Sequence, residues 1–181
     1  MGSLDGRIAL ITGSSRGIGE YLAKHLAKAG AKVAIAARTI EVTDKRLPGT
    51  IYSVAESINS EGGTATPVVM NMRDPESITN GVSQAAEELG GLDIVINNAA
   101  ILVPGNLETV QDRHLDLIWQ IDLRGPLLLM KYALPHLKDA GRGDIINVSS
   151  VAGVFPGPGP YDSTPQRREG SFYGMVKAGL E

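Results

Sequence analysis

Short runs of β-branched residues alternate along the chain with longer segments of helical periodicity, and this alternation constrains the fold more than any other feature. The runs that we expect to form strands are Ile8 to Thr12, Lys32 to Ala36, Thr64 to Met70, Ile94 to Asn97 and Asp144 to Ser149. Strand–helix–strand units of this kind join parallel strands in one sheet. Because the runs are largely apolar, we expect buried strands with helices on both faces. The sequence therefore predicts an α/β fold, a Rossmann-like doubly wound parallel sheet.

The predicted helices fill the segments between these runs. They are Gly17 to Ala29, Thr50 to Ser60, a helix capped by Asp74 with Pro75 in its first turn, a region from Thr109 to Leu137 that Gly125 and Pro126 interrupt, and a last helix that begins near Ser171. Aspartate caps helix starts, and proline suits the first turn. No linker composition divides the chain, so we expect a single domain over residues 1–181. A doubly wound sheet usually adds strands after such a helix, so we interpret the chain as lacking the C-terminal strands.

Composition excludes several classes of function. The chain has no cysteine and only three scattered histidines, which predicts no metal site, no thiol nucleophile and no disulfide framework. The formal net charge is -3 and no basic run is present, so we expect no nucleic-acid partner. No apolar stretch approaches the ~20 residues that cross a bilayer. We therefore expect no membrane partner and a cytoplasmic location.

A glycine-rich turn, Thr-Gly-Ser-Ser-Arg-Gly-Ile-Gly, follows the first predicted strand directly and opens the first predicted helix. Glycines in this context allow backbone amides and a helix N-terminus to approach a pyrophosphate. A plain strand-to-helix turn is the alternative interpretation. The candidate cofactor-binding residues of the turn are Gly13, Ser15, Arg16, Gly17, Ile18 and Gly19.

The turn resembles the Thr-Gly-x-x-x-Gly-x-Gly signature of the short-chain dehydrogenase/reductase family, and three later segments resemble that family in the same order. Asn97 to Ala100 resembles its Asn-Asn-Ala-Gly element, Asn147 to Ser150 resembles the end of its fifth strand, and Tyr173 to Lys177 matches Tyr-x-x-x-Lys. The resemblance implies that Asn98 and Ala99 border the nicotinamide ribose, which Lys177 also binds beside Tyr173. It further implies a homodimer or homotetramer of the full-length protein.

The same resemblance implies that Ser150, Tyr173 and Lys177 are catalytic, and chemistry gives independent reasons. Four-residue spacing places Tyr173 and Lys177 on one face of a helix. A tyrosine with a pKa near ~10 needs a nearby cation to act as an acid–base group at neutral pH, so we expect Lys177 to favour the phenolate. Ser150 would hydrogen-bond the substrate oxygen. An ordinary amphipathic helix is the alternative.

Asp122 departs from the family pattern, because it stands where Asn-x-x-Gly usually has a catalytic asparagine. In the family that residue holds a water through its main-chain carbonyl, which an aspartate also presents. Pro126 lies four residues later and has no N–H, so we expect the Asp122 carbonyl to lack its helical partner. The alternative is a residue that merely marks a helix kink.

A second departure is the long segment Pro156 to Gly170, which separates Ser150 from Tyr173. Tyr161 lies nearer the usual distance, but the residue four beyond it is Pro165 rather than lysine. We therefore assign the catalytic role to Tyr173. The inserted segment either shapes substrate specificity or is a solvated loop.

Cofactor choice is set at the end of the second strand, where NAD-preferring sites carry an acidic residue. Arg38 and Thr39 stand there instead, and Arg38 with Arg16 could surround a 2′-phosphate. NADP(H) is therefore favoured, with NAD(H) as the alternative if Glu41 or Asp44 approaches the ribose. Asn71, followed by Met72, occupies the position that accepts the adenine amino group in the family.

These features predict an NADP(H)-dependent oxidoreductase that interconverts a small-molecule secondary alcohol and its carbonyl. A non-catalytic NADP-binding or oligomerisation fragment of such an enzyme is the alternative. A serine hydrolase is disfavoured because no G-x-S-x-G elbow surrounds Ser150. An epimerase or dehydratase of the extended branch is disfavoured by the glycine spacing. Leu47 to Ile51 resembles the hydroxysteroid-dehydrogenase-like branch, which does not identify a substrate.

Overall fold

The computed structural model describes residues 2–103, 108–154 and 171–181, and its centre is one parallel sheet. The five strands are β1 (Ile8–Thr12), β2 (Lys32–Ala37), β3 (Thr64–Val69), β4 (Ile94–Asn97) and β5 (Asp144–Asn147). They are arranged in the order β3-β2-β1-β4-β5. The chain therefore leaves β1 toward one edge of the sheet and returns beside it as β4. This confirms the predicted Rossmann-like doubly wound sheet.

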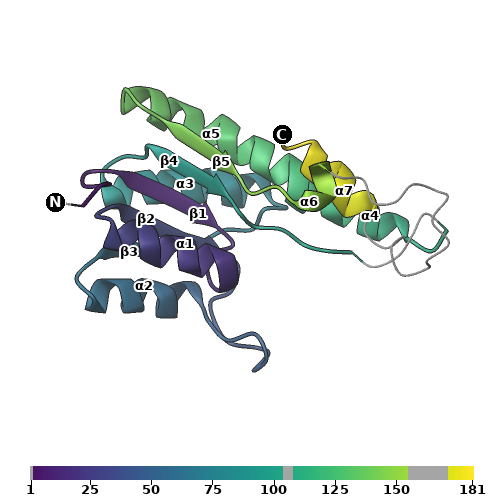
Figure 1. Ribbon diagram of the computed structural model, residues 1–181, viewed down its shortest axis with the longest axis horizontal. Coiled ribbons are helices and arrows are strands. Elements are labelled where there is room, and N and C mark those ends of the chain that lie inside the picture. The colour runs from purple at the N-terminus through teal and green to yellow at the C-terminus, as the bar shows by residue number, and fades with distance from the viewer. Residues whose placement is uncertain (1, 104–107, 155–170) are drawn as a thin grey trace.

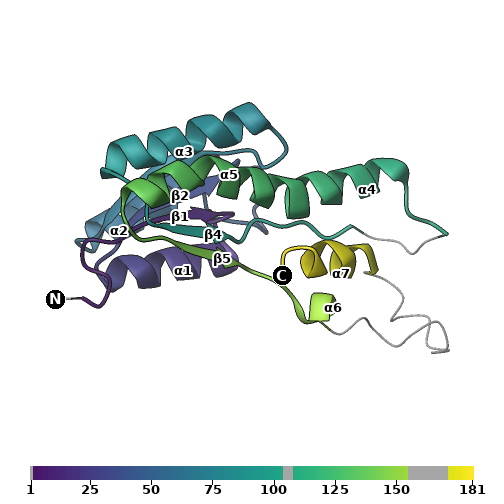
Figure 2. The same ribbon diagram turned by 90° about the horizontal axis from the view of Figure 1, so that it is seen from above.

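Helices cover both faces of the sheet. They are α1 (Gly17–Lys28), α2 (Ile51–Ser60), α3 (Pro75–Leu89), α4 (Asp112–Trp119), the π-helical segment η1 (Gln120–Arg124), α5 (Gly125–Asp139), α6 (Val151–Val154) and α7 (Ser171–Ala178). Figure 1 shows the strands fanned between these layers, and Figure 2 shows α3 and α5 on one side of the sheet with α1 on the other. Helices α6 and α7 lie beyond the carboxyl end of β5.

Alternation along the strands divides the apolar side chains between two cores. Leu10 faces α3 and α5 and packs in a cluster with Val68 and Leu129. Its neighbours Ala9 and Ile11 face the other way, into the cluster that α1 and α2 cover. Successive side chains of a strand point to opposite faces, so an unbroken apolar run fills both cores.

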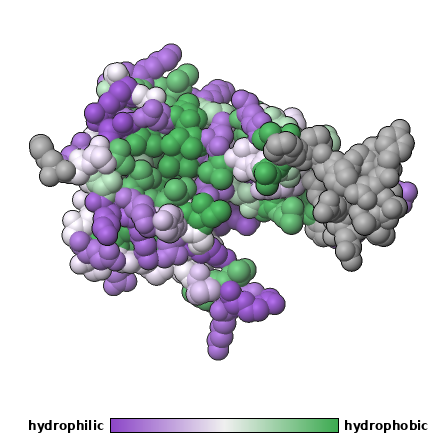
Figure 3. Space-filling view, viewed as in Figure 1, coloured by the Kyte–Doolittle hydropathy of each residue, from purple (hydrophilic) through white to green (hydrophobic). Residues whose placement is uncertain are grey.

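β5 differs from the buried strand that the sequence predicts. Ile145 and Ile146 are 41% and 47% exposed, because within the described residues β5 pairs with β4 alone. Figure 3 shows a hydrophobic area over this side of the sheet. The prediction of short apolar strands was right for the pairing of β5 and wrong for its burial.

Gly125 and Pro126 do not interrupt the helical region, which runs through α4, η1 and α5 without a break. The Gly125 N–H bonds to the Gln120 carbonyl five residues earlier, as in a π-helix. Pro126 has no N–H, and the π-helical turn directly before it accommodates this loss without breaking the helix. Thr50 also differs from its prediction: it caps α2 by accepting the Ser53 N–H at 3.0 Å instead of being its first residue.

A charged cluster joins the amino ends of β1, β4 and β5. The Asp93 carboxylate, with 5% of its side chain exposed, accepts Arg7 Nε at 2.9 Å, Arg142 Nε at 3.0 Å and the Ile8 N–H at 3.0 Å. Arg7 also bonds to Asp144 at 2.5 Å. Asp93 therefore holds three strand ends in register.

We expect Asp93→Ala to lower the free energy of unfolding by about 3 kcal/mol, because it removes the carboxylate that Arg7 Nε, Arg142 Nε and the Ile8 N–H share. Urea unfolding followed by circular dichroism measures the change. Asp44→Ala is the matched control, since its ion pair with Arg46 is exposed and should leave the midpoint unchanged. Equal midpoints for Asp93→Ala and the wild type would contradict the assignment.

Within the described part of the chain, no helix combines the length and apolar character needed to cross a membrane.

Candidate active site

A cavity of about 310 Å³ opens at the carboxyl ends of the strands, where the chain order reverses around β1. Crevices at this switch point are the usual ligand sites of doubly wound sheets. The predicted cofactor residues that line it are Gly13, Ser15, Arg16, Arg38, Thr39, Asn71, Met72, Asn98 and Ala99. The loops after β1, β2, β3 and β4 therefore contribute to one groove.

The glycine turn after β1 forms one wall of this groove and cannot carry side chains at two of its glycines. Gly13 has φ of +67°, and a Cβ there would lie 2.8 Å from the Ala99 Cα. A Cβ on Gly19 would lie 2.5 Å from the Gly13 carbonyl oxygen. Both positions require glycine for close approach of backbone segments.

Asn98 and Thr12 brace this turn from the β4 side. The Asn98 side-chain amide donates to the Thr12 carbonyl at 2.8 Å, and the Thr12 hydroxyl accepts the N–H groups of Asn98 and Ala99 at 3.1 Å. Ser14 adds a link to β2, because its hydroxyl donates to the Ile11 carbonyl at 2.7 Å and accepts the Ala36 N–H at 2.9 Å. Sequence reasoning included Thr12 and Ser14 in the glycine-rich turn but assigned neither of them a role in bracing it.

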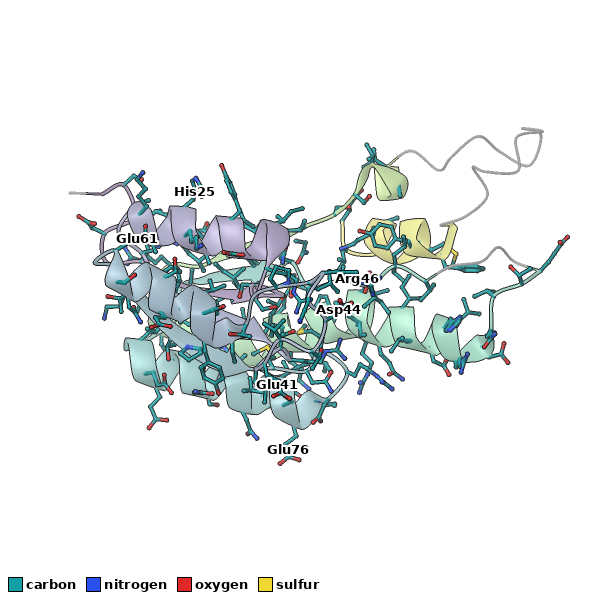
Figure 4. All side chains as sticks on the ribbon, turned by 90° about the horizontal axis from the view of Figure 1, so that it is seen from below. His25, Glu41, Asp44, Arg46, Glu61 and Glu76 are labelled. Carbon is teal, nitrogen blue, oxygen red and sulfur yellow. The ribbon has the colours of Figure 1, made fainter. Side chains whose placement is uncertain are left out.

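Two arginines stand at the β2 end of the groove. Arg16 donates from Nη2 to the Thr39 hydroxyl at 2.8 Å, and its Nε is buried without a hydrogen-bond partner among the described residues. Arg38 is exposed. Asp44 forms an ion pair with Arg46 at 2.8 Å, and Figure 4 shows this pair on the loop that follows β2. Arg16 is therefore held in place by Thr39, whereas Arg38 is exposed to solvent at the rim of the groove.

Asn71 lies in the groove, and its side-chain oxygen accepts a hydrogen bond from its own loop. That oxygen accepts the Arg73 N–H at 3.2 Å, and the Asn71 N–H donates to Ser77 Oγ at 3.0 Å. The predicted residues Gly17, Ile18 and Gly19 do not line the cavity. Ile18 is 66% exposed at the start of α1.

Tyr173, Lys177 and Ser150 come together where α7 packs against α6. A Cβ on Gly174 would lie 2.6 Å from the Ala152 carbonyl oxygen, and one on Gly153 would lie 2.9 Å from the Ala178 nitrogen. These two glycines allow the helices to touch. As a result the Tyr173 phenol forms a hydrogen bond with the Ser150 side chain.

Lys177 lies beneath this pair and is almost completely buried. Its Nζ is 5.5 Å from the centre of the Tyr173 ring and donates to the Val148 carbonyl at 2.8 Å. Burial lowers the pKa of Lys177, and the charge of Asp122 opposes that change. Val148 had no predicted role, because its contribution is a backbone carbonyl.

The pKa of Tyr173 is raised, opposite to the direction expected from a neighbouring lysine. Burial of the phenol is the main cause, the charge of Asp122 is the second, and the hydrogen bond from Ser150 acts the other way. Lys177 is not among the causes of the shift in the Tyr173 pKa, and its ammonium donates to the Val148 carbonyl instead.

Asp122 lies in η1 with its side chain completely buried. Its Oδ1 accepts the Ile101 N–H at 2.9 Å, while Oδ2 has no hydrogen-bond partner in the parts of the chain that the structure describes. Burial raises the pKa of this carboxyl to about 6, against the opposing effects of the Ile101 amide and the Lys177 charge. Isolated π-helical turns often occur at functional sites.

Tyr161 and the segment Pro156 to Gly170 lie outside the described residues. In the segments that are described, no group of three or more His, Cys, Asp and Glu side chains could hold a metal ion.

Comparisons with known proteins agree with this geometry. Hydroxysteroid dehydrogenase-like protein 2 of Bos taurus is 42% identical over 156 residues, which cover 86% of this chain and 37% of that protein. A short chain dehydrogenase from Mycobacterium thermoresistibile has a TM-score of 0.82 at 35% identity, and a short chain dehydrogenase from Burkholderia cenocepacia in complex with NADP has 0.80 at 32%. Each structure is matched over 98% of this chain, which covers 60% and 65% of theirs.

The chain thus spans just over a third of that curated relative and about two thirds of the solved structures. The family model described as short chain dehydrogenase matches residues 7–163, which is most of the chain. Together with the doubly wound sheet, this match shows that the chain belongs to the short-chain dehydrogenase family.

Proposed function

We propose that this protein is an NADP(H)-dependent oxidoreductase that interconverts a secondary alcohol and its carbonyl by hydride transfer. Membership of the family supports the broader class of NAD(P)-dependent oxidoreductases. The observation that carries the finer proposal is the contact of three groups: the Tyr173 phenol bonded to Ser150, with Lys177 beneath the ring.

The groove fits a dinucleotide. Gly13 and Gly19 allow the turn to pack closely on its own backbone and on Ala99, and the backbone amides of such a turn at the start of α1 could hold a pyrophosphate. The Arg16 Nε is buried and lacks a protein acceptor in the described residues. A 2′-phosphate would supply such an acceptor, with Arg38 as a second guanidinium.

When bound, the nicotinamide would supply or accept the hydride. In the reducing direction Tyr173 would transfer its phenolic proton to the substrate oxygen, which Ser150 also binds by a hydrogen bond. Lys177, held at the Val148 carbonyl, would bind the ribose and stabilise the phenolate that remains. The Asp122 main-chain carbonyl is the proposed site for a water that returns the proton.

The assay that tests the proposal follows reduced nicotinamide absorbance with a panel of ketones and secondary alcohols. Turnover with NADP(H) is expected. Nucleotide binding without turnover for any compound would instead support the alternative, a non-catalytic NADP-binding or oligomerisation fragment.

We expect Arg38→Asp to weaken NADP⁺ binding about 10- to 100-fold, because a charge-assisted hydrogen bond is worth ~1.5–3 kcal/mol and the new carboxylate repels phosphate. Binding of NAD⁺ should improve, since an acid at this place can bond the ribose hydroxyls. Isothermal titration with both nucleotides measures the two affinities. Arg46→Asp is the matched control, because Arg46 lies on the same loop but pairs with Asp44. A wild-type preference for NAD(H) that Arg38→Asp leaves unchanged would contradict the assignment.

A homodimer or homotetramer of the full-length protein is also proposed. The exposed apolar side chains of α4, α5 and α7 support it, among them Trp119, Leu127 and Met175, which are 50–69% exposed. The cytoplasmic location and the absence of nucleic-acid and membrane partners stay predictions of the sequence.

A further inference from the structure

We propose that the side-chain carboxyl of Asp122 favours the protonated form of Tyr173 and thereby extends carbonyl reduction by this site to higher pH. This inference rests on the proposed function, and it assigns to the side chain a role separate from that of the Asp122 main-chain carbonyl. Asp122 acts through Tyr173 and is therefore a positioning residue.

The first support is the packing of η1 against α7. Leu123 lies beside Gly179, where a Cβ would come within 3.1 Å of the leucine Cδ2 atom. Ile101, whose N–H bonds to Asp122, packs in the same apolar cluster as Tyr173 and Val176. The carboxyl therefore lies at an interface whose other side carries the catalytic tyrosine and lysine.

The second support is the environment of the carboxyl itself. Its side chain is completely buried, and Oδ2 lacks a hydrogen-bond partner within the described residues, so water and protein dipoles do little to screen its charge. An asparagine would keep the oxygen that accepts the Ile101 N–H and remove the charge. The charge is thus the property that distinguishes this residue from the family's usual one.

The groups around the carboxyl define the sign of its effect. Lys177 from α7 is the cation that stabilises the Asp122 anion, and the loop after β4 contributes the Ile101 amide. The phenolate form of Tyr173, on α7, is destabilised by the Asp122 anion and stabilised by the hydrogen bond from Ser150. The remaining charged residues of α4 and η1, which are Asp112, Arg113, Asp116 and Arg124, are exposed, while His114 is half-buried.

The destabilisation of the Tyr173 phenolate by the Asp122 anion has a consequence for the reaction. In the proposed reduction, bound reduced nicotinamide would supply a hydride to the substrate carbon, Tyr173 would give its proton to the substrate oxygen, and a solvent proton would then return to the phenolate. The burial-raised pKa of Asp122, about 6, makes it an anion at neutral pH. An anion beside Tyr173 keeps the phenol protonated to higher pH, while oxidation needs a higher pH to form the phenolate. The overall equilibrium does not change.

Nuclear magnetic resonance of the full chain labelled with ¹³Cζ-tyrosine tests this without turnover, both alone and with NADP⁺. Tyr173→Phe assigns the signal among the five tyrosines. We expect Asp122→Asn to shift the Tyr173 midpoint to lower pH and Asp116→Asn, an exposed acid on α4, to leave it in place. An unchanged or higher midpoint in Asp122→Asn overturns the proposal.

A second measurement uses the wild type alone and holds even if Asp122→Asn does not fold. The Tyr173 signal should show an additional step near pH 6, where Asp122 titrates. A Tyr173 signal without that step overturns the proposal.

Activity gives a third readout that separates this inference from the proposed function. In Asp122→Asn the alkaline limb of the pH profile of kcat/KM for reduction should move to lower pH, with little change in substrate KM. A loss of packing alone would not shift this limb. Turnover with identical pH profiles in the two proteins overturns the inference and leaves the proposed function standing. An absence of all turnover refutes the proposed function, and the Tyr173 midpoint still decides the electrostatic coupling.

Discussion

Tyr173→Phe is expected to lower kcat by about 10²–10⁴-fold while NADP⁺ affinity changes little. The substitution keeps the ring that packs with Val176 and Ile101 and removes only the hydroxyl that bonds to Ser150. Because that hydroxyl would carry the transferred proton in the proposed reaction, the loss should fall on the chemical step and not on nucleotide binding. Steady-state kinetics and isothermal titration on the same preparation measure the two effects.

Two other tyrosines give this experiment its controls. Tyr52→Phe, at an exposed position on α2, should leave kcat unchanged. Tyr161 is the rival that the sequence offers for the catalytic role. Full activity in Tyr173→Phe together with its loss in Tyr161→Phe would show that the catalytic tyrosine is misassigned.

The fold class and the position of the groove could be predicted because they depend on local patterns. β1 is apolar at each central position, which is required of a strand with a core on each face, and it is followed at once by the glycine turn. A parallel strand that ends in such a turn places its carboxyl end at the ligand crevice. The continuous apolar run thus predicts a central strand with a core on each face, and the glycines that follow it predict the position of the cofactor groove.

The burial of particular side chains depends on tertiary packing and could not be predicted. Asp122 is a single polar residue in an amphipathic pattern, and it is completely buried in η1, which packs against α7 through Leu123 and Gly179. A separate contact of α7, with the residue that follows β5, gives Lys177 the Val148 carbonyl as its acceptor. The raised pKa of Tyr173 follows from these contacts, so the sequence, which shows only the Tyr-x-x-x-Lys spacing, predicted the opposite direction.

The π-helical segment is also a tertiary feature. Its sequence has helical periodicity, and the Gly-Pro pair suggested an interruption that the structure replaces with a wider turn. At Gly125 a Cβ would lie 2.6 Å from the Met72 carbonyl, so the helix there lies against the loop after β3. The missing proline N–H and this close approach are both accommodated by the wider turn, which no local propensity predicts.

Lys177→Met is expected to reduce both turnover and nucleotide affinity, which distinguishes it from Tyr173→Phe. Methionine fills most of the buried volume of the lysine stem but leaves the Val148 carbonyl without its 2.8 Å donor. It also removes the cation that favours ionisation of Asp122, so the pKa of that carboxyl should rise further. We expect kcat to fall about 10²–10⁴-fold with a weaker NADP⁺ Kd, measured by the same kinetics and titration.

Two further substitutions test whether the buried ammonium itself is required. Lys177→Arg should not restore activity, because a planar guanidinium cannot replace a compact ammonium at one buried carbonyl. Lys131→Met removes an ammonium that lies 5.4 Å from the Tyr132 ring centre, a similar contact at an exposed position of α5, and should have no effect. If Lys177→Met kept wild-type turnover, the phenol would be activated by Ser150 alone, and the role assigned to the Tyr-x-x-x-Lys spacing would be wrong.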